Sequence, residues 1–152
     1  NVLVNNAGIL RFGDIERMPA DEVELLWRVN QLGVFLGMQA VSRTMRKNGG
    51  GSIINTSSIE GLGGMAMCTG YTGTKFAIRG MTKTAALDLG DKGVRVNSVH
   101  PGSIETPLTA GLTRGIGQIP AGRTGQPEEV ADLVLDHPGH RPQLARPVLL
   151  GR

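Results

Sequence analysis

Apolar and polar positions along this chain fall into blocks that predict strands and helices in turn. Short apolar runs at residues 2–4 and 53–54, and an alternating segment at residues 94–99, each end in small or turn-forming residues, which indicates strands. Between and after them, apolar residues recur at helical spacing over about residues 19–29, 31–47, 70–89 and 127–135. Strands that alternate with helices predict an α/β fold built on a parallel sheet.

The boundaries of the first two helices are marked by particular residues. Pro19, Asp21 and Glu22 suit the first turn of a helix, where an N–H is free and acidic side chains meet the positive end of the dipole. A second helical pattern follows Asn30 and stops at the glycines after Asn48. An asparagine between two helical stretches is most simply a helix breaker.

Composition narrows the class of protein. The 152 residues suffice for one domain, and 23 glycines with few aromatic residues suit an α/β protein with tight turns. The net charge of +3 is spread along the chain without aromatic clustering, so we expect no nucleic-acid partner. Cys68 is the only cysteine, which excludes an internal disulfide and fits a reducing compartment. No segment resembles a membrane span or a signal peptide, so the sequence predicts a cytoplasmic protein.

The candidate chemistry lies in residues 52–75. Tyr71 and Lys75 are four residues apart, so on a helix they share one face. The charge of Lys75 would favour the phenolate and lower the pKa of Tyr71, which makes the pair an acid–base device. Ser58, at the tip of a predicted strand, could hold the oxygen that gains or loses the proton. Together the three side chains predict chemistry that interconverts an alcohol and a carbonyl compound.

This spacing resembles the active-site signature of the short-chain dehydrogenase/reductase family, in which a serine stands thirteen residues before the tyrosine of Tyr-x-x-x-Lys. Three further segments are similar to family motifs: Asn-Asn-Ala-Gly at 5–8, Val-Asn-x-x-Gly at 29–33 and Pro-Gly-x-x-x-Thr at 101–106. The four motifs occur in the family's order. The resemblance implies a partial Rossmann-type, doubly wound parallel sheet with helices on both faces.

Carried over residue by residue, the resemblance implies a catalytic set of Asn30, Ser58, Tyr71 and Lys75. Tyr71 would exchange a proton with the substrate, and Ser58 would hold the substrate oxygen. Lys75 would lower the pKa of Tyr71 and bind the nicotinamide ribose, while Asn30 would hold a water that links Lys75 to solvent.

The resemblance also implies NAD or NADP as the cofactor. The family's phosphate-binding turn and the residue that selects NAD or NADP precede Asn-Asn-Ala-Gly and have no counterpart here, so the preference stays open. We therefore expect residues 1–135 to be the catalytic part of one NAD(P)-binding Rossmann domain without its first strands, and 136–152 to be an atypical, irregular tail. The implied cofactor-binding residues are Asn6, Ala7, Gly8, Tyr71, Lys75, Pro101, Gly102, Ile104 and Thr106.

The substrate is expected to be a small secondary alcohol or ketone. Residues 51–107 resemble bacterial hydroxysteroid dehydrogenases of the 3-alpha/20-beta type more than fatty-acid ketoreductases, and an apolar wall at Met65 and Met67 agrees with a hydrophobic alcohol. Other small alcohols, polyketide ketones and sugar alcohols remain open. In the family, the helices that match 31–47 and 70–89 pair with those of a neighbour, which implies a homo-oligomer, a dimer or tetramer.

The sequence allows other interpretations. A non-catalytic fragment that cannot bind cofactor is the main alternative; a sugar-nucleotide epimerase and a plain α/β binding module account for fewer motifs. The glycines at 61–64 do not open a helix directly after a strand, so we reject a phosphate-binding loop there. His137 and His140 lack partner ligands for a metal, His100 is expected to be structural, and residues 108–126 suit a mobile lid.

Overall fold

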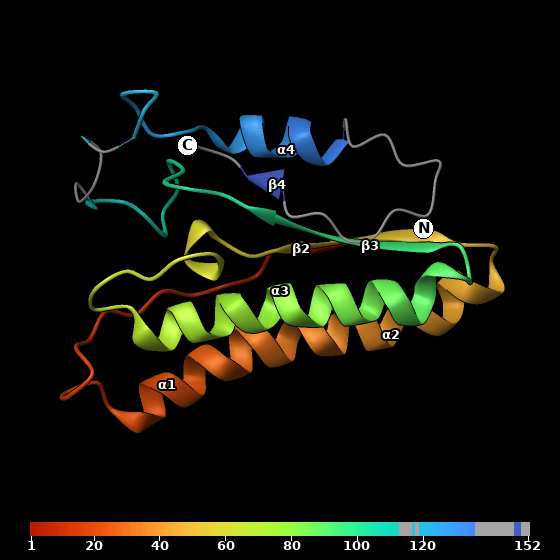
Figure 1. Cartoon of the computed structure of the whole chain (residues 1–152), viewed down its shortest axis with the longest axis horizontal. Coiled ribbons are helices and arrows are strands. Elements are labelled where there is room, and N and C mark those ends of the chain that lie inside the picture. The colour runs from red at the N-terminus through yellow and green to blue at the C-terminus, as the bar shows by residue number, and fades with distance from the viewer. Residues whose placement is uncertain (113–116, 118, 136–147, 150–152) are drawn as a thin grey trace.

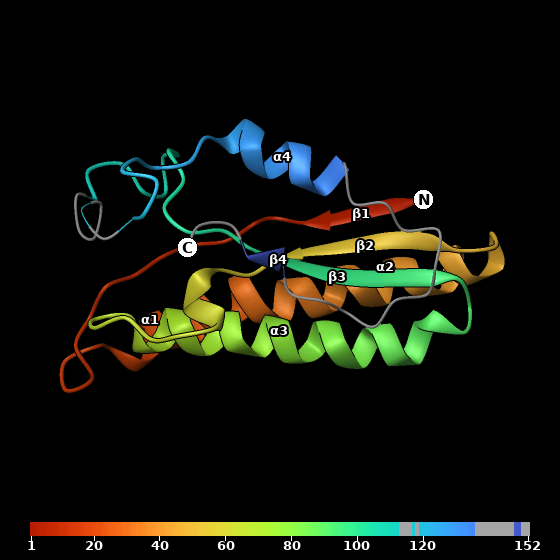
Figure 2. The ribbon, with the colours of Figure 1, turned by 45° about the horizontal axis from the view of Figure 1, so that its top comes forward.

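A computed structural model describes residues 1–112, 117, 119–135 and 148–149 of the chain. Within these residues a single parallel sheet has the strand order β1-β2-β3-β4 (Figure 1). The predicted α/β class is confirmed, and helices cover both faces of the sheet (Figure 2). The strands are β1 (Val2–Asn5), β2 (Gly51–Thr56), β3 (Val94–His100) and β4 (Val148–Leu149).

One face of the sheet is covered by two long helical segments, and α4 (Pro127–Leu135) lies on the other face (Figure 1). The first segment comprises α1 (Ala20–Leu26), η1 (Trp27–Leu32) and α2 (Gly33–Lys47); the second is α3 (Thr69–Gly90). Their apolar faces meet β2 and β3 in one cluster, which forms the main core. Its buried members are Val34, Met38, Met45, Ile53, Ile78, Leu89, Val94 and Val96.

The chain does not break at Asn30. Residues Trp27–Leu32 form a π-helical turn between α1 and α2, and the backbone at Leu26 and Gly33 on either side is right-handed helical. Hydrogen bonds in a π-turn join residues five apart in place of four, so the apolar stripe shifts its phase without an interruption of the helix. The helix-breaker interpretation of Asn30 is therefore wrong, and the residue is fully buried.

The predicted strand at residues 2–4 forms, but two of its three apolar side chains are exposed. β1 pairs with β2 in register Val2 with Ser52, but it is the edge strand of the described sheet. Val2 is 69% exposed and Val4 46% exposed, because their side chains point away from the face on which Leu3 packs against the main core. An uncovered apolar edge results.

Much of the segment from residue 108 onwards lies outside the described residues. Of the expected irregular tail, only Val148 and Leu149 are described, and they pair in parallel with Val99 and His100. His137 and His140 fall outside. Of the expected lid, residues 113–116 and 118 fall outside the described residues. Gly125, within the same segment, forms backbone hydrogen bonds with Ser103 and Glu105. None of the described helices is both long and apolar enough to traverse a bilayer.

Candidate active site

The candidate catalytic side chains converge where β2 and β3 end and α3 begins. In a parallel sheet the carboxyl ends of neighbouring strands share one edge, where α/β proteins bind ligands. Ser58 follows β2 by two residues, and Tyr71 and Lys75 occupy the first two turns of α3. The short 3-10 turn η2 (Ile59–Gly61) joins the two regions and packs on α3 (Figure 1).

The hydroxyl of Ser58 is oriented by its own turn. The residue has an extended backbone and caps η2, where its Oγ accepts a hydrogen bond from the N–H of Glu60 at 3.1 Å. Its carbonyl oxygen accepts from the N–H of Gly61 at 2.9 Å. Because the backbone supplies a donor to Oγ, the Ser58 proton is left to donate to Tyr71 or to a substrate oxygen.

Burial dominates the acidity of Tyr71, which is only 8% exposed. Desolvation raises the pKa of its phenol, a hydrogen bond with Ser58 lowers it, and the charges of Glu60 and Cys68 raise it further. The pKa of Tyr71 is therefore raised, and the expectation of a lowered pKa is wrong because desolvation is the largest cause of the shift. The Lys75 ammonium lies 5.4 Å from the centroid of the tyrosine ring, over its face.

Lys75 is itself buried, with 5% of its surface exposed, and burial lowers its pKa from 10.5 to about 8. Its Nζ donates to the carbonyl of Thr56 at 2.9 Å, which ties α3 to the end of β2. A Cβ added to Gly8 would lie 3.8 Å from this Nζ, so the turn after β1 passes directly beside the lysine. A lysine with this pKa exchanges its proton close to neutral pH.

Asn30 reaches the same region from the π-turn. Its Oδ1 accepts from the N–H of Ile9 at 2.8 Å, and its Nδ2 donates to the carbonyl of Ile9 at 2.9 Å and to Thr74 Oγ1 at 3.3 Å. The side chain thus anchors the segment that follows Gly8 and lies beside Lys75. Its role in a proton relay remains a prediction.

Three residues that support the candidate site were not predicted from the sequence. Ser57 Oγ donates to the carbonyl of Lys75 at 2.9 Å, and Thr74 Oγ1 donates to the carbonyl of Tyr71 at 2.7 Å. A Cβ on Gly61 would collide with Ser57 Oγ and would lie 2.8 Å from the Lys75 carbonyl oxygen, so only glycine allows η2 to approach α3 this closely. The run of small hydroxyl residues at 56–58 was the one signal that pointed to such packing.

The expected cofactor-binding residues line the same edge of the sheet. Asn6 and Ala7 are exposed and Gly8 is half-buried after β1, and the Asn6 side chain accepts from Thr56 Oγ1 at 3.1 Å. Pro101, Gly102, Ile104 and Thr106 are half-buried beyond β3. Amides, hydroxyls and backbone groups beside a lysine suit the carboxamide and ribose of a nicotinamide, so the residues present fit that half of NAD(P).

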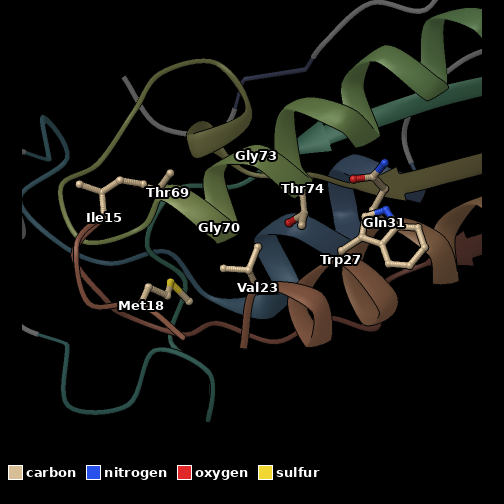
Figure 3. A pocket seen from close by; sticks show the side chains of 9 residues that line it. All are labelled: Ile15, Met18, Val23, Trp27, Gln31, Thr69, Gly70, Gly73 and Thr74. Atoms are coloured by element: carbon tan, nitrogen blue, oxygen red, sulfur yellow. The ribbon is translucent and has the colours of Figure 1, made fainter. Parts of the chain in front are cut away.

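An apolar groove of about 330 Å³ lies between α1, η1 and the first turns of α3 (Figure 3). Ser58 and Tyr71 do not line it, and neither do the exposed Met65 and Met67, whose role as a substrate wall remains a prediction. Across the described part of the chain, no group of three or more His, Cys, Asp or Glu could hold a metal ion. The groove is lined by Ile15, Met18, Val23, Trp27, Gln31, Thr69, Gly70, Gly73 and Thr74.

Comparison with known proteins decides the family. Residues 1–117 match the sequence profile of the family described as short chain dehydrogenase. The chain belongs to this family. It is 53% identical over 135 residues to a 3-alpha-(or 20-beta)-hydroxysteroid dehydrogenase of Mycobacterium tuberculosis, a match that covers 89% of this chain and 52% of the relative. NAD(P) use is characteristic of the family.

Two further relatives extend the comparison. A trans-4-hydroxycyclohexanecarboxylate dehydrogenase of Sinomonas cyclohexanicum is 51% identical, with the same coverage of 89% and 52%. The crystal structure of a gluconate 5-dehydrogenase from Burkholderia cenocepacia, in complex with NADP and tartrate, superposes with a TM-score of 0.88 at 31% identity. That match covers 99% of this chain and 62% of the neighbour. The chain thus spans about half the length of the curated relatives it matches.

Proposed function

We propose that this chain carries the catalytic part of an NAD(P)-dependent oxidoreductase that interconverts a secondary alcohol and a ketone. One observation carries the proposal. Three groups with complementary roles in proton transfer meet at the carboxyl edge of a parallel sheet: an oriented hydroxyl at Ser58, a buried phenol at Tyr71, and at Lys75 an amine whose pKa is about 8.

In this mechanism Tyr71 is the proton donor and acceptor. The raised pKa keeps its phenol protonated at neutral pH, ready to donate to the oxygen of a ketone as that oxygen gains negative charge. Ser58 donates a hydrogen bond to the same oxygen and stabilises the developing charge. Lys75 would hold the ribose side of the cofactor and would pass protons from Tyr71 toward solvent. A bound nicotinamide supplies the redox chemistry, and Asn6 to Gly8 and Pro101 to Thr106 would hold it.

We propose a hydroxyl group on a saturated ring as the substrate class. The names of the two most similar relatives described above support this, because the 3-hydroxyl of a steroid and the hydroxyl of a hydroxycyclohexanecarboxylate both stand on such a ring. A steroid is the first candidate. The buried single cysteine further supports a cytoplasmic site of action.

A homo-oligomer is proposed as well. Large apolar side chains stand exposed on the helical layer, notably Trp27, Phe35, Leu36, Phe76 and Leu87. Apolar residues gathered on one layer support an interface with a second copy. Light scattering of the purified chain tests this: a dimer or tetramer is expected, and a monomer at high concentration would contradict it.

Calorimetric titration of the purified chain with NADH and with NADPH tests the function, with circular dichroism to verify folding. We expect one of the two to bind, and oxidation of a hydroxysteroid or of cyclohexanol to exceed oxidation of gluconate. A folded chain that binds neither cofactor would instead support the alternative of a non-catalytic fragment. A preference for gluconate would contradict the ring-alcohol assignment alone.

A further inference from the structure

We infer that His100 is a positioning residue, which holds Ser58 in the orientation that directs its hydroxyl to Tyr71. The inference deepens the proposed function and rests on it for its catalytic meaning. The sequence predicts only a structural role for this histidine, at the turn after a strand. Its two ring nitrogens and their partners support the more specific role.

The imidazole of His100 has no exposed surface and uses both nitrogens. Nδ1 lies 2.9 Å from the carbonyl oxygen of Ser58, and Nε2 lies 2.9 Å from Oγ of Ser98. A carbonyl oxygen only accepts, so Nδ1 must carry the proton. In the neutral ring Nε2 then accepts from the hydroxyl of Ser98, which fixes a single tautomer.

The histidine acts where the ladder between β2 and β3 ends. Beyond the last paired residues, the N–H of Ser57 donates to the carbonyl of Val99 at 2.8 Å and that of Ile59 donates to Pro101 at 3.0 Å. The carbonyl of Ser58, between these two amides, takes its cross-strand donor from the His100 ring. The ring thereby fixes the peptide that follows Ser58 and the turn that orients its Oγ.

The surroundings keep this donor neutral. Burial lowers the pKa of His100, the charges of Arg79 and Lys75 on α3 lower it too, and the hydrogen bond to Ser58 raises it. The net pKa lies below the usual value. At neutral and alkaline pH the ring is uncharged, so its replacement by an uncharged side chain alters hydrogen bonding and packing without a change of charge.

Tyr71 is the only tyrosine of the chain, so ultraviolet absorbance of its phenolate reports on the site without cofactor or turnover. Ser58→Ala removes the hydrogen bond that lowers the pKa of Tyr71. We expect the ratio of phenolate to phenol to fall roughly three- to tenfold at a given alkaline pH. His100→Leu and His100→Gln lose the Nδ1 donor and should shift the ratio in the same direction, by at least half as much.

His100→Asn is the conservative variant, because its amide nitrogen can occupy the place of Nδ1, and it should restore the wild-type ratio. Thr82→Val is the matched control, since it removes a fully buried hydroxyl from a separate network with Asn55 and should leave the ratio unchanged. The ratios are compared over the pH range in which circular dichroism shows every variant folded.

A wild-type ratio in folded His100→Gln, beside a lowered ratio in Ser58→Ala, would overturn the positioning role. An unchanged ratio in Ser58→Ala would overturn it as well, since the link from Ser58 to Tyr71 would be absent. An inactive chain, by contrast, contradicts the proposed function and leaves the outcome of the titration unaffected.

Discussion

β1 and β3 are strands of similar composition with opposite surroundings. Both are rich in valine, yet Val96 in β3 is 1% exposed while Val2 in β1 is 69% exposed. β3 has a strand on each side and α3 against its face, whereas β1 has a described neighbour on one side only. Burial along a strand is therefore set by its neighbours. The candidate catalytic groups lie at the end of the well-covered strands, where polar side chains find fixed partners.

Among the variants that test this contrast between the two strands, Tyr71→Phe has the largest expected effect, on turnover. It removes one hydroxyl from the site and leaves the apolar packing of the ring in place. We expect turnover to fall about 10²- to 10⁴-fold, because the proton donor is lost, while cofactor affinity changes little. Steady-state rates and calorimetry measure the two quantities. Turnover close to wild type in the folded variant would remove Tyr71 from the mechanism.

The buried Lys75 makes stability depend on pH. Its pKa is about 8 in the folded state, below its ordinary value of 10.5, so between pH 8 and 10 the unfolded chain binds more protons. Stability should therefore rise with pH across this window, by up to about 2 to 3 kcal/mol.

Urea unfolding at several pH values measures this dependence. Lys75→Met should abolish the rise, because it keeps the volume and removes the titrating group. Lys83→Met, at an exposed position of the same helix, is the matched control and should retain it. A wild-type slope in Lys75→Met would assign the effect to another group.

A pair of equal truncations contrasts the two strands most directly. Val96→Ala removes buried methyl groups from the main core and should lower the free energy of unfolding by about 2 kcal/mol. Val2→Ala removes the same atoms from the exposed edge and should cost less than about 0.5 kcal/mol. Chemical denaturation of both variants gives the difference. Equal losses would mean that the outer face of β1 is covered in solution.

Local patterns predicted much of the fold and the site. The spacing of Tyr71 and Lys75 placed both on one face of α3, since helical geometry follows from a few consecutive residues. The π-turn at Asn30 escaped prediction because its hydrogen-bond register is set by packing against the segment at Ile9. The direction of the Tyr71 pKa escaped for a similar reason, because desolvation depends on atoms distant in the sequence.

The sequence by itself determined the order of the first three strands and of the helices, the family, and three candidates for the reactive side chains. These follow from periodicity and from spacing within short segments. Only the tertiary structure decided which strand is exposed, that burial governs the acidity of Tyr71 and Lys75, and that His100 reaches the carbonyl of Ser58. Such properties depend on neighbours that the fold brings together, as it does His100 and Ser58, which are 42 residues apart along the chain, and no local pattern records them.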